Sequence, residues 1–94
     1  MRGRYLVAYD VSDPKRLTRM RTTVRGFGVS LQYSVFLCEL SDHERVLLRT
    51  AVTEVINADE DRVLIVSLGP AGGRGGECME LLGRQHSPEE SGAL

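Results

Sequence analysis

The sequence has too few cysteines and histidines, too widely spaced, for a zinc site or a disulfide-bonded scaffold. Cys38 and Cys78 lie far apart without a Cys-x-x-Cys pair, and His43 and His86 have no metal-ligand spacing. This pattern indicates neither a zinc site nor a disulfide framework. We expect both cysteines to be small, reduced, apolar side chains.

Long apolar runs and a large net charge are also missing. No apolar stretch approaches the roughly 20 residues of a membrane span, and nothing at the N-terminus resembles a signal peptide. We therefore expect a cytoplasmic protein with no membrane partner. The 12 basic and 13 acidic residues leave a net charge of −1, so any attraction to nucleic acid must come from a local patch.

Three stretches carry the pattern of β-strands. Two are near-continuous apolar runs, typical of strands that are covered on both faces or central in a sheet, and the third alternates between apolar and polar positions. The third is long for one strand, so we expect a bend or bulge near Tyr33 and Ser34 that divides it in two. The three stretches are residues 4–10, 62–68 and 29–40.

Two amphipathic stretches lie between these strands. The first predicts a helix over residues 14–26, with Asp13 as its N-cap and a proline as its first residue. The second predicts a helix over residues 42–57, which begins with a capping box formed by Ser41 and Glu44. Both stretches carry apolar side chains at helical spacing on one side.

This order of elements predicts an α+β, ferredoxin-like βαββαβ domain over residues 1–84, with a four-stranded antiparallel sheet and both helices on one face. A weak element, either a short strand or a turn of helix, is expected near residues 77–83. Residues 85–94 form a polar tail that we expect to be disordered. Because the chain is short and the second sheet face is apolar and uncovered, we predict a homodimer packed sheet on sheet.

Asp10 is the candidate for chemistry. It follows the first apolar run directly, and a carboxylate at the carboxyl end of a central strand is poorly placed for core packing. Sites in open α/β sheets gather at such strand ends, and carboxylate oxygens are natural ligands for Mg²⁺. The alternatives are that Asp10 caps local backbone amides in a turn, and that Asp13 serves as a second carboxylate instead of capping the helix.

The first predicted helix is basic on the side away from its apolar stripe, with no acid after its cap. We expect Arg16, Arg19 and Arg21 to contact the phosphate backbone of a nucleic acid, since arginine pairs with phosphate in bidentate geometry. The alternative is an ordinary solvated helix face.

Three side chains are candidates for a supporting role, one near the end of the first apolar run and two at the expected bend in residues 29–40. Ser34 is a candidate to bind a phosphate or the waters of a metal, and Tyr9 and Tyr33 are candidates to stack on bases. The alternative for Ser34 is a plain strand hydroxyl. For the two tyrosines the alternative is packing in the core or at an interface.

Two motifs carry a resemblance to a known family. They are YLVAYDVSD at residues 5–13 and LQYSVF at residues 31–36, separated by the basic helix and Gly28. Together they resemble the small CRISPR-associated endonuclease family, the smaller of the two nearly universal CRISPR adaptation proteins. The resemblance covers residues 4–82, and it is looser over the later strand at residues 63–68.

The resemblance implies a ferredoxin-like homodimer in which the two copies of Asp10 face each other and bind Mg²⁺, with Mn²⁺ as an alternative. It implies a metal-dependent endonuclease that acts on single-stranded RNA or double-stranded DNA. It also implies that the dimer bridges the CRISPR integrase during spacer acquisition. An extra C-terminal strand, here residues 78–83, would add to the sheet of the partner subunit.

Two other functions stay open at this point. One is a non-catalytic adaptor that binds duplex DNA and the integrase, since one carboxylate per chain supplies few groups for catalysis. The other is an unrelated ferredoxin-like module, such as a toxin-type ribonuclease or a small-ligand regulatory domain. That module would share only the fold.

Overall fold

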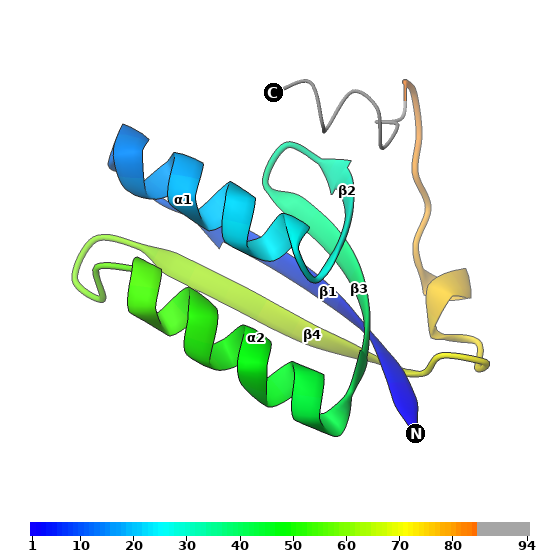
Figure 1. Ribbon diagram of the computed structural model, residues 1–94. Helices are drawn as coiled ribbons and strands as arrows, with labels where there is room; N and C mark the ends of the chain where they lie inside the picture. Colours follow the sequence, from blue (N-terminus) through cyan, green and yellow to red (C-terminus); the bar gives the residue numbers. More distant parts are fainter. Residues whose placement is uncertain (85–94) are drawn as a thin grey trace.

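The computed structural model describes residues 1–84 and confirms the predicted order of strands and helices (Figure 1). The strand boundaries differ from the predicted ones by only a few residues. The elements are β1 (Arg2–Asp10), α1 (Pro14–Arg25), β2 (Gly28–Gln32), β3 (Val35–Ser41), α2 (Asp42–Val55), β4 (Arg62–Pro70) and the single-turn 3-10 helix η1 (Gly75–Cys78).

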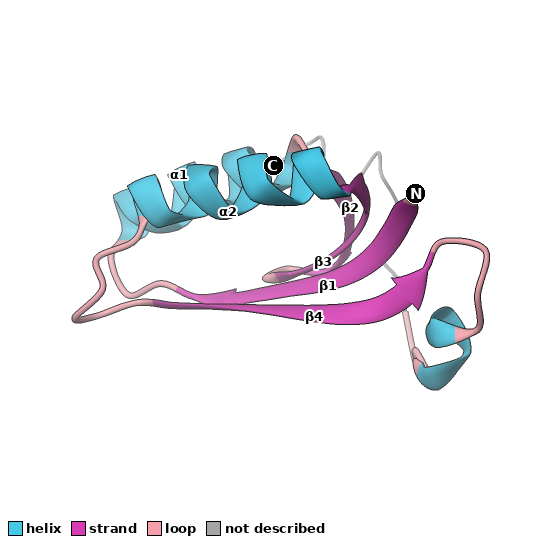
Figure 2. Cartoon of the chain, turned by 90° about the horizontal axis from the view of Figure 1, so that it is seen from below, coloured by secondary structure: helices cyan, strands magenta, loops and turns pink. Residues whose placement is uncertain are grey.

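The four strands form one antiparallel sheet in the order β2-β3-β1-β4, which confirms the ferredoxin-like topology. The first strand is therefore central, and its neighbours come from the middle and the end of the domain. Figure 2 shows α1 and α2 side by side on one face of this sheet. Within residues 1–84 no α-helix lies on the other face, and only the single-turn η1 lies on that side, near the end of β4.

The hydrophobic core lies between the helices and the covered face of the sheet. Alternate residues of β1 and β3 point into it, as the period-2 pattern of strands requires. Phe36, Met20 and Leu48 are its largest fully buried side chains. Cys38 is also fully buried there, and burial raises the pKa of its thiol to about 11. Cys38 is therefore the inert apolar side chain that the sequence predicts, whereas Cys78 is exposed.

Both predicted helix caps are present. The Asp13 carboxylate accepts a hydrogen bond from the backbone N–H of Arg16 at 2.9 Å. The Ser41 hydroxyl accepts the N–H of Glu44 at 3.1 Å, and the Glu44 carboxylate accepts the N–H of Ser41 at 2.8 Å. The second helix ends at Val55, two residues before the predicted end.

Gly28 sets the start of the hairpin formed by β2 and β3. A Cβ atom at this position would lie 2.3 Å from the Leu37 carbonyl oxygen and 2.5 Å from the Cys38 sulfur. No side chain fits in that space, so β2 approaches β3 closely only because residue 28 is glycine. The hairpin then ends in the Tyr33–Ser34 turn, where the sequence predicts a break between two strands.

One expectation about β4 needs correction. The sequence pattern predicts a buried strand, but β4 lies at the edge of the sheet, where Leu64 is 58% exposed and Val66 is 36% exposed. Residues 79–84 form no helix or strand in this single chain, and the addition of residues 78–83 to the sheet of a partner subunit stays a prediction. The predicted disordered tail, residues 85–94, lies outside the described residues. No helix within residues 1–84 is long and apolar enough to cross a membrane.

Candidate metal and nucleic-acid site

Asp10 is the last residue of β1, and its side chain is exposed. Side chains alternate along a strand, so the burial of Val7 and Tyr9 places Asp10 on the open face of the sheet. No hydrogen bond or ion pair within residues 1–84 involves its carboxylate. The alternative of Asp10 as a local turn cap therefore has no hydrogen bond to support it in this part of the chain.

Asp10 offers the donor chemistry of a Mg²⁺ or Mn²⁺ ligand, but it is a single carboxylate. Within the described residues, no group of three or more His, Cys, Asp or Glu side chains is arranged to hold a metal ion. Asp13, the alternative second carboxylate, is used as the cap of α1. Mg²⁺ often binds through one or two carboxylates and several waters. The chain therefore fits such an ion if the remaining donors are waters, a ligand or a second copy.

A buried carboxylate, Asp61, holds the loop that follows Asp10. Its side chain has no exposed surface, and it accepts hydrogen bonds from the backbone N–H groups of Ser12 (3.1 Å) and Asn57 (2.9 Å). It also accepts one from Nε of Arg16 at 2.7 Å. We call these contacts the Asp61 clasp. The bond from Arg16 is the main reason that the pKa of Asp61 lies far below its usual range, although burial opposes it.

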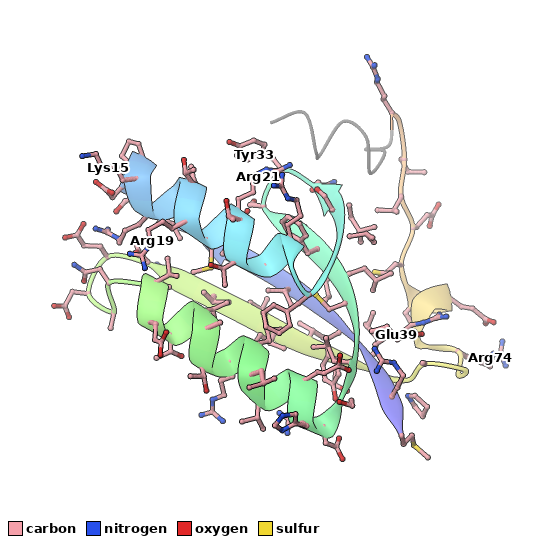
Figure 3. All side chains as sticks on the ribbon, viewed as in Figure 1. Lys15, Arg19, Arg21, Tyr33, Glu39 and Arg74 are labelled. Carbon is pink, nitrogen blue, oxygen red and sulfur yellow. The ribbon has the colours of Figure 1, made fainter. Side chains whose placement is uncertain are left out.

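The three arginines predicted to contact phosphate have three different environments. Arg16 belongs to the Asp61 clasp and lies 3.3 Å from the Glu60 carboxylate as well. Arg21 is only 6% exposed, so the expectation that it lies on the basic outer face of α1 is wrong. Arg19 is exposed, as is Lys15 one turn earlier (Figure 3). Phosphate contact by the three arginines stays a prediction. Of the three, only Arg19 would contact a phosphate without giving up a partner within residues 1–84.

Tyr9 and Ser34 meet where the end of β1 reaches the turn between β2 and β3. The Tyr9 N–H donates to the Ser34 carbonyl (3.1 Å), and the Tyr9 hydroxyl donates to the Tyr33 carbonyl (3.3 Å). The Tyr9 ring is buried and stacks on Phe36. Burial raises the pKa of the Tyr9 hydroxyl more than nearby Arg21 lowers it. These contacts tie the residue before Asp10 to the turn, and a chemical role for Tyr9 or Ser34 stays a prediction.

The sequence analysis missed two features of this region. One is the contact between Arg21 and Tyr33, in which the guanidinium lies 4.7 Å from the centre of the ring (Figure 3). The other is Asp61. A signal for Asp61 was available, because the acidic turn at residues 59–61 has the charge that complements the basic first helix. That signal does not say which of the three acids is buried.

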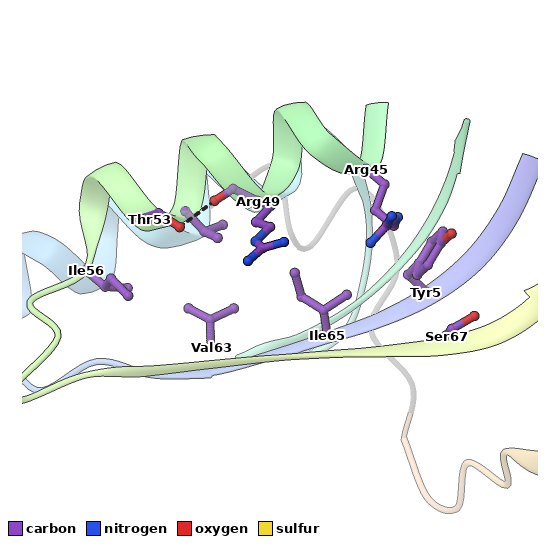
Figure 4. A pocket seen from close by; sticks show the side chains of 9 residues that line it. Tyr5, Arg45, Arg49, Thr53, Ile56, Val63, Ile65 and Ser67 are labelled. Atoms are coloured by element: carbon purple, nitrogen blue, oxygen red, sulfur yellow. Dashed lines mark hydrogen bonds between the residues drawn. The ribbon is translucent and has the colours of Figure 1, made fainter. Parts of the chain in front are cut away.

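A separate cleft of about 390 Å³ lies between α2 and the edge strand β4 (Figure 4). Val63 and Ile65 form its apolar floor, and Arg45 and Arg49 reach into it from the helix. Asp10 does not line this cleft. It is therefore distinct from the candidate metal site.

Comparison with known proteins identifies relatives over most of the chain. Residues 1–72 match the family model described as CRISPR associated protein Cas2. A protein of Geobacter sulfurreducens named CRISPR-associated endoribonuclease Cas2 is 43% identical over 67 residues, which is 71% of this chain and 70% of the relative. A Rhodospirillum rubrum protein named CRISPR-associated endoribonuclease Cas2 1 is 40% identical, over 71% of this chain and 66% of its own.

Solved structures agree with this comparison. The crystal structure of Streptococcus pyogenes Cas2 superposes with a TM-score of 0.73 and 28% identity, covering 85% of this chain and 99% of that one. A hypothetical protein of Thermus thermophilus superposes with a TM-score of 0.76 and 27% identity, covering 94% of this chain and 99% of that one. The similarity extends over the whole ferredoxin-like sheet and both helices.

Proposed function

Because the chain belongs to the CRISPR-associated Cas2 family, we propose that it is a cytoplasmic, metal-dependent endoribonuclease of CRISPR adaptation, with Asp10 as its metal-binding residue. The observation that carries the proposal is the exposed Asp10 carboxylate, which has no ion pair or hydrogen bond within residues 1–84. Several relatives are named endoribonucleases. Family membership also removes the alternative of an unrelated ferredoxin-like toxin or regulatory module.

We propose that the active unit is a homodimer joined through the open faces of two sheets. Leu64, Val66 and Val29 are 58%, 36% and 50% exposed, and apolar side chains of this size favour burial. A two-fold pairing of one patch with itself buries both copies at once. Such a dimer supplies two Asp10 carboxylates, and a cation between them offsets their mutual repulsion.

Bound Mg²⁺ or Mn²⁺ would supply a Lewis acid and an activated water for phosphodiester hydrolysis. The chain's own residues prepare the place for it. The Asp61 clasp and the Tyr9–Ser34 hydrogen bond fix the backbone on both sides of Asp10. Arg19 and Lys15, exposed on the adjoining helix, would neutralise phosphates of the nucleic acid near it.

The test is a cleavage assay on the purified full chain, with single-stranded RNA and duplex DNA as substrates. Each substrate is incubated with Mg²⁺, with Mn²⁺ and with EDTA. Asp10→Asn is purified in parallel, since it removes the charge and keeps the shape. The matched control is Asp42→Asn, because Asp42 is also exposed but lies at the opposite end of the sheet, next to the partner of Arg2 in the strand register.

We expect the wild type and Asp42→Asn to cut RNA with either metal, and Asp10→Asn and EDTA to abolish cutting. Cutting by Asp10→Asn at the wild-type rate would refute the role of the carboxylate. Cutting of duplex DNA in preference to RNA would keep the mechanism and change the substrate.

A second candidate function is a non-catalytic adaptor that binds double-stranded DNA and bridges the CRISPR integrase. One observation favours it: no cluster of three metal-ligating side chains exists within residues 1–84. In this case Asp10→Asn would leave duplex binding and co-purification with the integrase unchanged, and the wild type would cut neither substrate. Charge reversal at Arg19 would then weaken duplex binding for all sequences and flatten its salt dependence.

The proposed homodimer also gives a role to the C-terminal segment. The edge strand β4 leaves backbone groups open for pairing, and the adjoining cleft presents Arg45 and Arg49. Residues 78–83 of a second copy contain both apolar side chains and Glu80. We therefore expect this segment to add to the β4 edge in the dimer, and deletion of residues 78–94 to weaken dimerisation.

A further inference from the structure

Arg21 is the least expected buried group in the molecule. Its side chain comes from α1 and is only 6% exposed, yet none of the ion pairs within residues 1–84 includes it. Nη1 donates a short hydrogen bond (2.6 Å) to the backbone carbonyl of Tyr33. Nε and Nη2 are buried with no hydrogen-bond partner in the described part of the chain. Burying a charge in this way is costly, so other interactions of the guanidinium must offset the loss of its hydration.

Aromatic rings provide that compensation. The guanidinium lies 4.7 Å from the centre of the Tyr33 ring and 5.7 Å from the centre of the Phe36 ring. Phe36 stacks in turn on Tyr9, with ring centres 6.2 Å apart and planes inclined by 24°. Tyr9, Phe36, Arg21 and Tyr33 therefore form a continuous series of planar groups, which we call the stacked column. It leads from the buried Tyr9 and Phe36 to the exposed Tyr33, and Figure 3 shows Arg21 and Tyr33 at its outer end.

Tyr33 is the outer end of the stacked column, and it keeps 51% of its surface exposed. One side of its ring faces the guanidinium, so a second planar group would have to stack on the opposite side. Cation–π contact and the hydrogen bond to its own carbonyl hold the residue in place. An aromatic ring held in this way loses little conformational entropy when another flat group packs on it.

We propose that Tyr33 is a stacking platform for an unpaired nucleobase, and that the platform makes the protein prefer single-stranded to duplex nucleic acid. Bases inside a duplex have both faces covered by their neighbours, so only an unpaired base is free to stack on a side chain. The Tyr33 carbonyl accepts a hydrogen bond from Tyr9, the residue before Asp10. A base on Tyr33 thus brings its strand to the end of the sheet that carries Asp10.

This inference rests on the proposed nucleic-acid function and specifies the kind of strand. Stacking is tolerant of sequence, because every base has a π-face. The platform therefore does not distinguish RNA from DNA by itself. Any such distinction must come from other contacts of the sugar.

The experiment measures equilibrium binding of a labelled oligoadenylate by fluorescence anisotropy, in EDTA to prevent cleavage. The probes are single-stranded RNA, single-stranded DNA of the same sequence, and the DNA annealed to its complement. Tyr33→Ala removes the ring, and Tyr33→Phe keeps it. Val46→Ala is the matched control, because Val46 is 54% exposed on α2.

Tyr33→Ala should still fold, at somewhat lower stability because Arg21 loses one ring, since Phe36 remains beside Arg21 and the backbone carbonyl of residue 33 still accepts from Arg21 and Tyr9. We expect it to weaken binding of both single strands about tenfold and to leave duplex binding unchanged. Tyr33→Phe and Val46→Ala should bind like the wild type. Circular dichroism checks that all variants are folded.

A spectroscopic variant tests stacking directly. The chain contains no tryptophan, so Tyr33→Trp creates a single reporter at the platform. Its fluorescence should be quenched by the single strands at the concentrations that saturate binding, and the duplex should leave it unchanged.

Wild-type affinity of Tyr33→Ala for single strands would overturn the inference, and so would an absence of single-strand binding by the wild type. Equal losses for single strand and duplex, or an equal loss in Tyr33→Phe, would also overturn it. These binding results do not test the proposed nuclease activity, which is decided by the cleavage assay. If Tyr33→Ala loses single-strand affinity but the wild type shows no metal-dependent cutting, the platform stands and the nuclease proposal falls.

Discussion

The two faces of the sheet are built from the same strands, but only one is completed within the chain. On the covered face, Val7, Phe36 and Cys38 have no exposed surface because α1 and α2 pack on them. On the open face, Leu64 is 58% exposed and Val29 is 50% exposed. Both faces carry apolar side chains, and the open face also carries Asp10 and the Arg4–Glu39 ion pair. The difference lies in what covers them, and in the proposed dimer a second copy would cover the open face.

The two aspartates near the end of β1 show the same contrast. Asp61 is buried and satisfied by several donors, so its charge serves the fold. Asp10 is exposed on the open face without such a bond in residues 1–84. A carboxylate without a bond to any other group in residues 1–84 is available for a ligand.

The largest effect should follow from Phe36→Ala on the covered face. Phe36 is fully buried and contacts both Tyr9 and Arg21. Removing the ring leaves a cavity and should lower the free energy of unfolding by about 3–5 kcal/mol, which is enough to unfold much of a small domain. Urea titration followed by circular dichroism measures it. A loss as small as that of Leu64→Ala would contradict the contrast between the faces.

The next effect concerns association through the open face. Leu64→Glu places a charge at the centre of the proposed dimer interface, where it would be buried without a partner. We expect the dimer to weaken on the order of a hundredfold, while the monomer keeps its circular dichroism spectrum. Sedimentation equilibrium over a range of concentrations measures the change. Glu54→Ala, on the exposed side of α2, is the control and should leave the dimer intact.

A smaller effect should follow from Asp61→Asn, which weakens the Asp61 clasp. The melting temperature at neutral pH should fall by several degrees, because the ion pair with Arg16 is lost. The pKa of Asp61 is lowered in the folded chain from its usual 3.8, so the unfolded chain takes up the proton first as the solution is acidified. The clasp therefore stabilises fully above about pH 5 and loses its contribution as pH falls further.

Thermal melts between neutral pH and pH 3 measure this dependence. The wild type should lose more stability on acidification than Asp61→Asn, and the two melting temperatures should converge at low pH. A constant difference between them over the whole range would contradict the assigned pKa shift of Asp61. The control Asp59→Asn removes an exposed acid from the same turn and should melt like the wild type.

The smallest effect on stability should be that of Asp10→Asn. The carboxylate makes no ion pair within residues 1–84, so the free energy of unfolding should change by less than about 0.5 kcal/mol. In the dimer, removal of two facing charges should strengthen association slightly when no metal is present. A loss of stability comparable to that of Asp61→Asn would mean that Asp10 is part of the fold.

The sequence was sufficient for the elements and their order, because periodicity, caps and glycine positions act locally. Asp13 and Ser41 each have the role that their immediate neighbours dictate. The sequence also made Asp10 the candidate carboxylate, because it directly follows an apolar strand. What it left unresolved was which basic and acidic residues face inward.

Arg21 illustrates why the rest was not predictable. It lies four residues after Leu17, so helical periodicity places it beside the apolar stripe rather than opposite it. Its burial depends on Tyr33 and Phe36, which a later hairpin brings over α1. The partner of Arg16, Asp61, comes from still further along the chain. Such pairings depend on tertiary packing, so the local sequence around each residue predicts them only weakly.

The position of β1 in the middle of the sheet has a consequence for how the chain folds. The strand at the beginning of the sequence pairs with β3 on one side and with β4, the last strand, on the other. Neither pairing forms between adjacent segments, and such long-range closures slow folding. Until β4 arrives, one edge of β1 is open. Refolding should therefore be limited by the docking of β4, and intermediates that lack it should be the species most prone to aggregate.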